Sequence, residues 1–264
     1  MADIKIPNLP SDKVTLNLPD SELPNVSIVM PCYKRRRFIP LMIANINNQD
    51  YPKDKLELCI LQDGEKDLFI DENRLKAFRQ AIHPVKLKYK YEPNVRRTIG
   101  NKRNILVKNM ASHKFIANMD SDDIYMNSYI RYSINGIKEH KAGISTSVSM
   151  LFVYPHKNFV MSAIKCGWKC QGHEGCSVFT KKHFNSVGGF GKTQKAEGVK
   201  MLDASDKKVL NLDVDKLMCC VSHNVDDGNT VDKEQFLDAA REFAEFQEEG
   251  GWRSILADIC QVKE

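Results

Sequence analysis

Apolar and polar residues alternate with two different periods along the first half of the chain. Short apolar runs bounded by turn residues predict strands, and apolar residues that repeat every three or four positions predict helices. In chain order these rules predict strand 26–30, helix 38–48, strand 56–61, helix 72–82, strand 85–91, helix 100–110 and strand 114–119. Such a strand–helix repeat predicts an α/β protein with a mostly parallel central sheet flanked by helices.

The pattern is less regular in the second half. We expect a helix at 129–140, a strand at 143–153, a smaller strand-containing part after it and a helix at 180–187. Near the end, one apolar stripe predicts a single amphipathic final helix, with acidic residues largely outside the stripe. The members of this stripe are Phe236, Leu237, Ala240, Phe243 and Ala244.

An acidic cluster follows the apolar run 114–119. In an extended chain, residues two apart point the same way, so Asp120 and Asp122 would converge on one point. Two carboxylates that meet need a cation or a shared proton between them, and oxygen ligands suit Mg²⁺ or Mn²⁺. The alternative is a solvated turn rich in aspartate. Right-handed crossovers place the strand ends on one edge of the sheet, where we expect the ligand.

The charge of the chain is unevenly distributed. The 264 residues carry a formal net charge of +5, with 42% hydrophobic and 28% charged residues, which excludes a disordered tail, a collagen-like fibre and a disulfide mini-protein. Residues 33–114 carry +10 and residues 225–264 carry −7. The basic segment favours an anionic ligand, either a nucleic acid or a phosphorylated small molecule.

The sequence predicts a soluble, cytoplasmic protein. No apolar run approaches the roughly 18 residues of a membrane span, and the start lacks the basic and apolar regions of a signal peptide. We therefore expect the eight cysteines to be reduced thiols. A zinc site is a second hypothesis for four soft side chains, although their spacing matches no common zinc module. These side chains are Cys166, Cys170, His173 and Cys176.

Several motifs occur in a fixed order along the chain. They are VSIVMPCYKRRRFIPLMIANINNQDYP, LELCILQDG, GNKRN, FIANMDSDD and, more loosely, GCSVFTKKHFNSVGGF. Through these motifs, residues 26–230 resemble the inverting glycosyltransferases of family two, which have the nucleotide-sugar-binding GT-A fold. The resemblance implies a GT-A domain with a nucleotide-binding half (26–125) and an acceptor and catalytic half (126–230). Residues 1–25 are then an N-terminal leader, and 231–264 are a C-terminal helical extension.

The resemblance also implies roles for individual residues. The turn after the first strand would bind the base and ribose of the donor through Pro31, Tyr33 and Arg35. The other donor-binding residues would be Asp63 at the base, Lys102 and Arg103 along the nucleotide, Asp120 at the diphosphate and Trp168 over the sugar. The metal ligands would be Asp122, Asp120 and His223. The alternative for each is an ordinary surface or core position.

An inverting transferase needs a base that removes the proton of the acceptor hydroxyl during in-line attack. Members of the resembled family usually carry Glu-Asp after a Gly-Gly-Phe segment. Here Glu197 matches the glutamate, but Gly198 replaces the aspartate. We therefore predict Glu197 as the base and keep Glu174 and Asp203 as alternatives.

The resemblance implies transfer of a hexose from a nucleotide sugar, a UDP-sugar foremost, to a hydroxyl of a glycan or other acceptor, with Mn²⁺ or Mg²⁺ as cofactor. A nucleotidyltransferase is one alternative, but it would carry a glycine-rich loop where the chain has Pro31-Cys32-Tyr33. A non-catalytic nucleotide-sugar-binding relic would explain the missing aspartate. A nucleic-acid binder would explain the basic segment, but the chain lacks the aromatic platform of such readers, so we expect no nucleic-acid partner.

Overall fold

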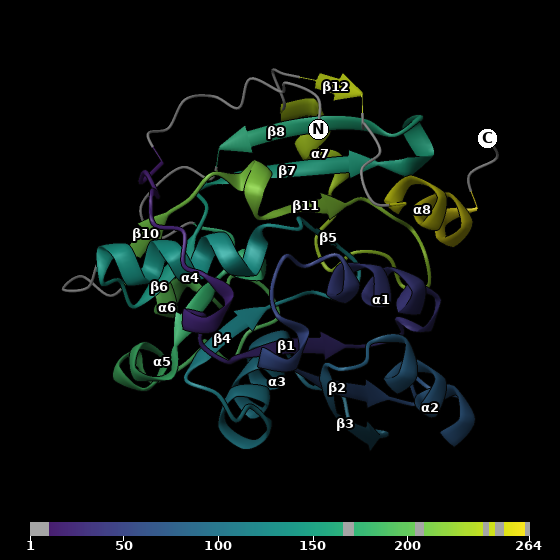
Figure 1. Cartoon of the computed structure of the whole chain (residues 1–264). Coiled ribbons are helices and arrows are strands. Elements are labelled where there is room, and N and C mark those ends of the chain that lie inside the picture. The colour runs from purple at the N-terminus through teal and green to yellow at the C-terminus, as the bar shows by residue number, and fades with distance from the viewer. Residues whose placement is uncertain (1–10, 166–171, 204–208, 240–242, 246–250, 262–264) are drawn as a thin grey trace.

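The protein is built around a seven-stranded sheet with strand order β10-β6-β9-β4-β1-β2-β3. The computed structural model describes residues 11–165, 172–203, 209–239, 243–245 and 251–261 (Figure 1). The strands of this sheet are β1 Val26–Cys32, β2 Leu56–Gly64, β3 Lys86–Pro93, β4 Phe115–Asn118, β6 Ile144–Thr146, β9 Val178–Thr180 and β10 Val209–Asn211. Strand β1 pairs in parallel with β2 and β4, and β2 pairs in parallel with β3. The mostly parallel α/β sheet that the sequence predicts is therefore confirmed.

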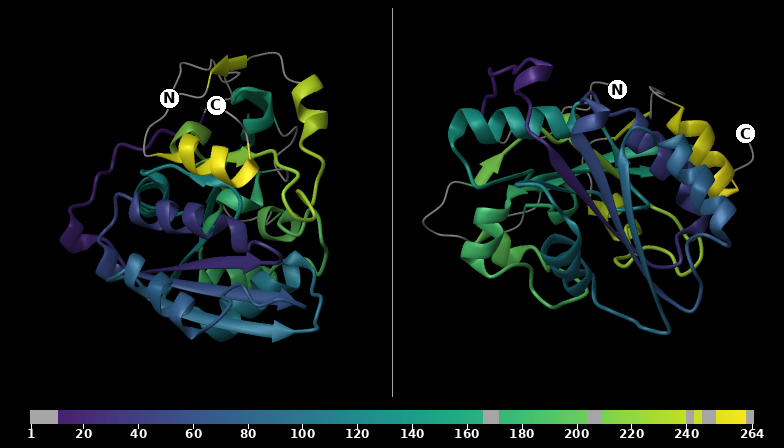
Figure 2. Two further views of the ribbon diagram at one scale, coloured as in Figure 1. Left: turned by 90° about the vertical axis from the view of Figure 1, so that its right-hand side faces the viewer. Right: turned by 60° about the horizontal axis from the view of Figure 1, so that its bottom comes forward.

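Helices cover both faces of this sheet (Figure 2). Successive residues of a strand point to opposite faces, so Ile28 and Met30 of β1 join one core while Val29 joins the other. The helices of the first core are α1 Ile39–Asn47, α2 Glu72–Ala81 and α4 Tyr129–His140. Those of the second core are α3 Ile99–Ile105 with its π-helical continuation Leu106–Met110, α5 Lys181–Val187 and α6 Val199–Leu202.

A second, five-stranded sheet extends the first core, with strand order β12-β8-β7-β11-β5. Its strands are β5 Ile124–Tyr125, β7 Ser149–Tyr154, β8 Val160–Lys165, β11 Met218–Val221 and β12 Phe243–Glu245. Phe152 of β7 stacks on Phe236 of α7 (Glu234–Ala239), with ring centroids 4.9 Å apart. Helix α8 (Trp252–Cys260) packs Trp252 into the same core.

The single strand predicted at 143–153 is wrong, because this segment contributes to both sheets. Its first part is β6 of the seven-stranded sheet, and its last part is β7 of the five-stranded sheet. At the break, the Val148 N–H donates to Asn211 Oδ1 of β10 at 3.0 Å. The residues at the break are mostly small polar side chains that are buried like their apolar neighbours, so periodicity does not reveal where the chain changes sheets. They are Ser145, Thr146, Ser147 and Ser149.

The single final helix predicted from the apolar stripe is also wrong. Helix α7 ends at Ala239, and Phe243–Glu245 forms β12, which pairs antiparallel with β8. Helix α8 is a separate element after it. Pairing with the open edge of β8 outweighs the helical preference of the sequence. Among the helices of the described residues, none is long and apolar enough to cross a membrane.

The N-terminal residues 11–25 run beside α4. The Thr15 hydroxyl donates to Glu139 Oε1 at 2.6 Å, and the backbone N–H of Leu16 donates to Glu139 Oε2 at 3.0 Å. The Asp12 N–H donates to the Asn211 carbonyl at 2.7 Å, which ties the same segment to β10. Val14 and Leu18 pack against the first core.

Candidate active site

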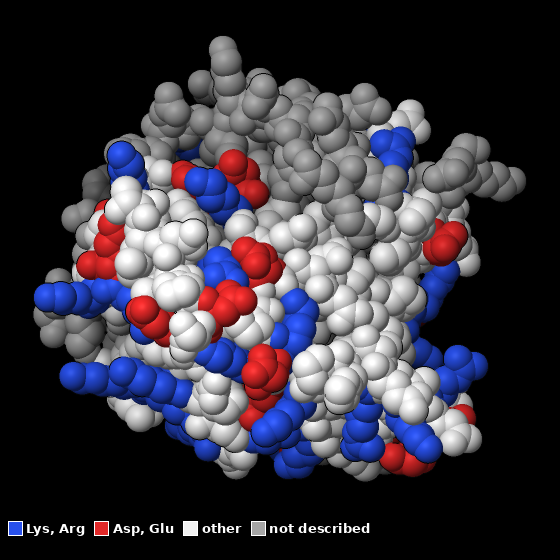
Figure 3. Space-filling view, viewed as in Figure 1, with Lys and Arg blue, Asp and Glu red and all other residues white. Residues whose placement is uncertain are grey.

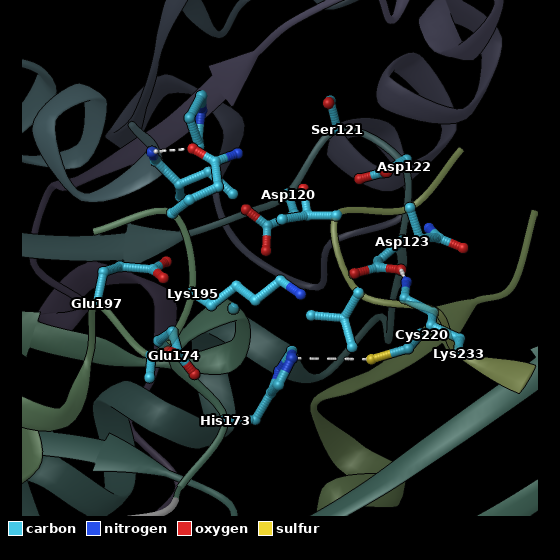
Figure 4. A pocket seen from close by; sticks show the side chains of 18 of the residues that line it. Asp120, Ser121, Asp122, Asp123, His173, Glu174, Lys195, Glu197, Cys220 and Lys233 are labelled. Atoms are coloured by element: carbon cyan, nitrogen blue, oxygen red, sulfur yellow. Dashed lines mark hydrogen bonds and ion pairs between the residues drawn. The ribbon is translucent and has the colours of Figure 1, made fainter. Parts of the chain in front are cut away.

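A pocket of about 780 Å³ opens beyond the carboxyl ends of β1 and β4 (Figure 4). Ligands of open α/β sheets bind at this edge, so the pocket lies where the sequence predicts it. Its walls are the turns after β1 and β4, residues of β7 and β11, the loops 172–175 and 194–199, and the segment 227–236. The predicted site residues that line it are Pro31, Tyr33, Arg35, Lys102, Arg103, Asp120, Asp122, Glu174 and Glu197.

The basic charge of residues 33–114 has two locations. Four cationic side chains line the pocket, namely Arg35, Arg96, Lys102 and Arg103. Other lysines and arginines of this segment are exposed, and Figure 3 shows such side chains gathered over the lower part of the molecule, which holds β3, α2 and α3. An anionic small molecule in the pocket would meet the first group.

The acidic turn after β4 pairs each of its three carboxylates with a different cation. Residues 121–122 form a turn rather than an extended segment, so the alternation that predicts convergence of Asp120 and Asp122 does not apply. Each aspartate has its own cation: Arg103 Nη2 lies 2.8 Å from Asp120, Arg35 Nε 3.0 Å from Asp122 and Lys233 Nζ 2.7 Å from Asp123. The extended geometry from which the convergence is predicted is therefore absent, and protein cations neutralise the cluster.

Asp122 and His223 nevertheless form a pair of potential metal ligands. His223 Nε2 lies 3.1 Å from Asp122 Oδ2, and the His223 side chain is fully buried. Burial opposes ionisation of Asp122, but the charge of Arg35 and the hydrogen bond to His223 outweigh it and hold the pKa of this carboxyl well below its usual range. The carboxylate is therefore ionised, as a metal ligand must be.

The donor set fits a divalent ion that shares its coordination with a substrate. Within the described ranges, no group of three or more His, Cys, Asp or Glu side chains could hold a metal ion. Two protein ligands are few for a closed site, but Mg²⁺ and similar ions commonly bind through one or two carboxylates plus substrate phosphates. Asp122 and His223 would hold such an ion, whereas Asp120, which is engaged by Arg103, belongs to a different part of the pocket wall.

Asp63 is buried behind the pocket rather than in its wall. Its side chain is fully buried and is not among the residues that line the pocket. Lys102 Nζ lies 2.5 Å from Asp63 Oδ1 and donates to the Cys32 carbonyl at 2.7 Å, while the Arg97 N–H donates to Asp63 Oδ2 at 2.7 Å. In this arrangement Asp63 and Lys102 support the turn after β1. A direct contact between Asp63 and the nucleobase of the donor would require Asp63 to give up its hydrogen bonds to Lys102 and to the Arg97 N–H.

Tyr33 provides an aromatic face in the pocket. The Arg96 guanidinium lies 3.4 Å from the centroid of the Tyr33 ring. Gly64, with φ +104°, makes room for the ring, because a Cβ at this position would lie 2.8 Å from Tyr33 Cε2. Sequence reasoning missed Arg96, since an arginine in a loop carries no periodic signal.

Arg103 holds two carboxylates of the pocket in place. It is 1% exposed, and its Nε donates to Glu197 Oε1 at 3.0 Å while Nη2 donates to both oxygens of Asp120. Gly100 allows the start of α3 to pack on the loop that carries Glu197, since a Cβ there would lie 1.7 Å from the Gly191 carbonyl oxygen. Burial raises the pKa of Glu197, although the charge of Arg103 opposes this.

The glycine that replaces the aspartate of the resembled family makes room for Glu174. A Cβ on Gly198 would lie 2.5 Å from Glu174 Cβ, and the Gly198 N–H donates to Glu174 Oε1 at 3.3 Å. Both glutamates therefore line one pocket, and the proximity of Glu174 contributes to the raised pKa of Glu197. Asp203 is not among the residues that line this pocket.

Further residues line the pocket in addition to those that the resemblance implies. Figure 4 shows the Lys195 side chain extending across the pocket from the side of Glu197 toward Asp123. Lys233, from the C-terminal segment, also donates to the Val221 carbonyl at 2.9 Å. His173 Nε2 lies 3.9 Å from Cys220 Sγ, and both residues line the pocket. Trp168, like two members of the zinc hypothesis (Cys166 and Cys170), lies outside the described residues.

The fold is shared with known glycosyltransferases. The mannosyltransferase PcManGT from Pyrobaculum calidifontis, solved with GDP-Man and Mn²⁺, matches with a TM-score of 0.58 at 18% identity, over 80% of this chain and 60% of that chain. TarS 1–349 from S. aureus, solved with UDP-GlcNAc, matches with a TM-score of 0.60 at 15% identity, over 89% of this chain and 71% of that chain. This chain thus spans less than two thirds of the length of the mannosyltransferase.

None of the curated proteins matches the sequence significantly. The family model described as glycosyl transferase family 2, however, matches residues 27–169, which is more than half of the chain. The likeness to the solved structures shows the GT-A fold, in which the seven-stranded sheet and its helices agree with those neighbours. The chain belongs to glycosyl transferase family 2.

Proposed function

We propose that this protein is a divalent-metal-dependent, inverting glycosyltransferase that moves a sugar from a nucleotide sugar, a UDP-sugar foremost, to a hydroxyl of a glycan or other acceptor. The observation that carries the proposal is the content of one pocket. It is lined by the Tyr33 ring, by Asp122, whose carboxylate pairs with the buried His223 behind the wall, and by the buried Glu197 with its raised pKa. The Tyr33 ring suits the nucleobase of the donor, and the Asp122–His223 pair suits a metal-bound diphosphate. Glu197 suits the proton of the acceptor hydroxyl.

Support for a nucleotide-sugar donor also comes from the structural neighbours. The TarS structure contains UDP-GlcNAc, and the mannosyltransferase structure contains GDP-Man and Mn²⁺. In this chain the Tyr33 ring offers a face on which the nucleobase of the donor can stack. Arg96, whose side chain is 48% exposed, would have to leave both that ring and its 3.7 Å ion pair with Asp63 to make room for the nucleobase.

In the proposed reaction the bond between the anomeric carbon and the diphosphate oxygen breaks as the acceptor oxygen attacks from the opposite face. Glu197 takes the proton of the acceptor hydroxyl. The negative charge that develops on the departing diphosphate meets the positive charges of Arg35 and Lys195. A divalent ion held by Asp122 and His223 would supply further positive charge at that diphosphate.

The donor can be identified by ligand-linked stabilisation. We expect one nucleotide sugar to raise the Tm of the protein in a thermal-shift screen, and to raise it further with Mn²⁺, because a ligand that binds the native state stabilises it by mass action. The screen should contain UDP-sugars and GDP-sugars, with ADP-sugars as the control. Equal shifts for all nucleotides, or none for any, would argue against the proposed donor class.

Lys195 provides a test of charge stabilisation at the leaving group. We expect Lys195→Met to lower kcat by roughly tenfold to a hundredfold, because methionine keeps the apolar stem of lysine and removes its charge. Lys192→Met is the matched control, since Lys192 is exposed in the same loop and does not line the pocket. Steady-state kinetics decide the matter: equal losses in the two variants would exclude a specific role for Lys195.

The state of the cysteines supports the proposed cytoplasmic location. Within the described parts of the chain, the cysteines at positions 32, 59, 176, 219, 220 and 260 are free. Free, largely buried thiols are typical of a reducing compartment. Burial raises the pKa of the Cys219 thiol and raises the pKa of Cys220 to about 11, so both remain protonated at neutral pH.

A further inference from the structure

The oxygen that would bind the metal ion is shared with a guanidinium. Arg35 Nε lies 3.0 Å from Asp122 Oδ2, and His223 Nε2 lies 3.1 Å from that same oxygen. The side chain of Arg35 is 10% exposed and that of His223 is fully buried. A positive charge therefore stands beside the two groups that form the proposed metal site.

Backbone carbonyls hold Arg35 in this position. Its Nη1 donates to the carbonyls of Tyr33 and Lys34, each at 3.2 Å, and its Nη2 donates to the Gly228 carbonyl at 2.9 Å. The bond to Gly228 links the turn after β1 to the segment 227–236, which also lines the pocket. The guanidinium is thus held in the pocket wall by three carbonyls as well as by Asp122.

A divalent ion and this guanidinium compete for Asp122. A metal ion held by Asp122 would place its positive charge beside the Arg35 guanidinium, whose Nε lies 3.0 Å from the same carboxylate, and like charges this close repel strongly in a partly buried site. An ion that arrives alone offers the guanidinium no new acceptor. A diphosphate does offer one, because guanidinium groups bind phosphate oxygens bidentately.

We propose that Arg35 keeps divalent ions out of the Asp122–His223 site until a nucleoside diphosphate is bound, and that its guanidinium then transfers from Asp122 to the phosphate oxygens. This proposal rests on the proposed function, because it assumes the diphosphate and the metal site. It adds an order of binding, in which the ion enters with the nucleotide or after it. In this account Arg35 first excludes the ion from Asp122 and then binds the diphosphate.

Mn²⁺ binding measured by electron paramagnetic resonance of the free ion tests the proposal without any turnover. We expect the unmodified protein without nucleotide to bind Mn²⁺ at least tenfold more weakly than Arg35→Gln. Glutamine removes the charge but keeps amide donors for the backbone carbonyls. Arg35→Lys keeps the charge and should bind Mn²⁺ as weakly as the unmodified protein, and Arg37→Ala, an exposed arginine outside the pocket, is the matched control.

The outcomes separate this proposal from the proposed metal site. Equal Mn²⁺ affinity of the unmodified protein and Arg35→Gln, with intact folds by circular dichroism, would overturn the exclusion by Arg35. Tight Mn²⁺ binding by Arg35→Lys would overturn it independently, even if the glutamine variant did not fold. The metal site itself is tested by adding Asp122→Asn to Arg35→Gln in the presence of UDP: unchanged Mn²⁺ binding there would place the ion elsewhere.

Discussion

Replacement of Glu197 by glutamine is expected to lower kcat for sugar transfer by roughly 10²- to 10⁴-fold, because the variant cannot accept the proton of the acceptor hydroxyl. Glutamine has nearly the same shape, and its carbonyl oxygen can still accept the hydrogen bond from Arg103 Nε, which Glu197 accepts at 3.0 Å. The pocket wall should therefore stay intact. Isothermal titration with the donor should show binding close to that of the unmodified protein.

Glu174→Gln is the matched control for this variant. Glu174 lines the same pocket, and a glutamine there can still accept the hydrogen bond from the Gly198 N–H. We expect a much smaller loss of kcat than in Glu197→Gln. A larger loss in Glu174→Gln than in Glu197→Gln would assign the base to Glu174 instead.

The pH profile gives a second measure of the same residue. A base works only when deprotonated, and burial raises the pKa of Glu197. The rate should therefore fall as the pH falls through this raised pKa, with a midpoint above about 4.3, the ordinary value for glutamate. Glu197→Gln should lose this acidic limb, whereas Glu174→Gln should retain it.

The second large effect is expected at Asp122. Asp122→Asn should lower kcat by roughly 10²- to 10³-fold, because an uncharged amide is a poor ligand for a divalent ion and leaves the charge of the departing diphosphate less stabilised. The variant should also respond weakly to added Mn²⁺. Rates measured across a Mn²⁺ titration, with a metal chelator as the zero point, provide the test.

Asp227→Asn controls for a general loss of negative charge at the pocket. Asp227 lines the pocket, but its side chain is 56% exposed and pairs with Lys34 at 2.8 Å. An exposed pair of this kind contributes little, so we expect near-normal rates and an unchanged Mn²⁺ response. If Asp122→Asn behaved like Asp227→Asn, Asp122 would not be a metal ligand.

The core of the fold could be predicted because its elements follow simple periods. β1, β2 and β4 and the helices α1 and α4 are buried in the core, and β3 and α2 pack one apolar face against it, so the apolar residues of these elements repeat with the expected periods. β9 has three residues and lies directly before α5, and a period cannot be read from so short a run. β12 exists because β8 offers it an edge, which is a property of the tertiary structure.

The candidate site could be predicted in part, since most of its residues follow strands. The motif positions Tyr33, Arg103 and Glu197 line one pocket as expected. The partners of the aspartates could not be foreseen: Lys233 comes from a distant segment, and the aspartates lie in a turn rather than in the extended chain that the prediction assumes. Their pairing depends on the path of the chain rather than on any local pattern.

Proton NMR of the reaction with a UDP-sugar, Mn²⁺ and a panel of hydroxyl acceptors tests the central claim most directly. The account predicts release of UDP and a product sugar whose anomeric configuration is opposite to that of the donor, with Glu197→Gln inactive under the same conditions. Retained configuration would contradict the inverting mechanism. Binding of UDP-sugars and GDP-sugars without release of either diphosphate, over the whole acceptor panel, would contradict the assignment of transferase activity.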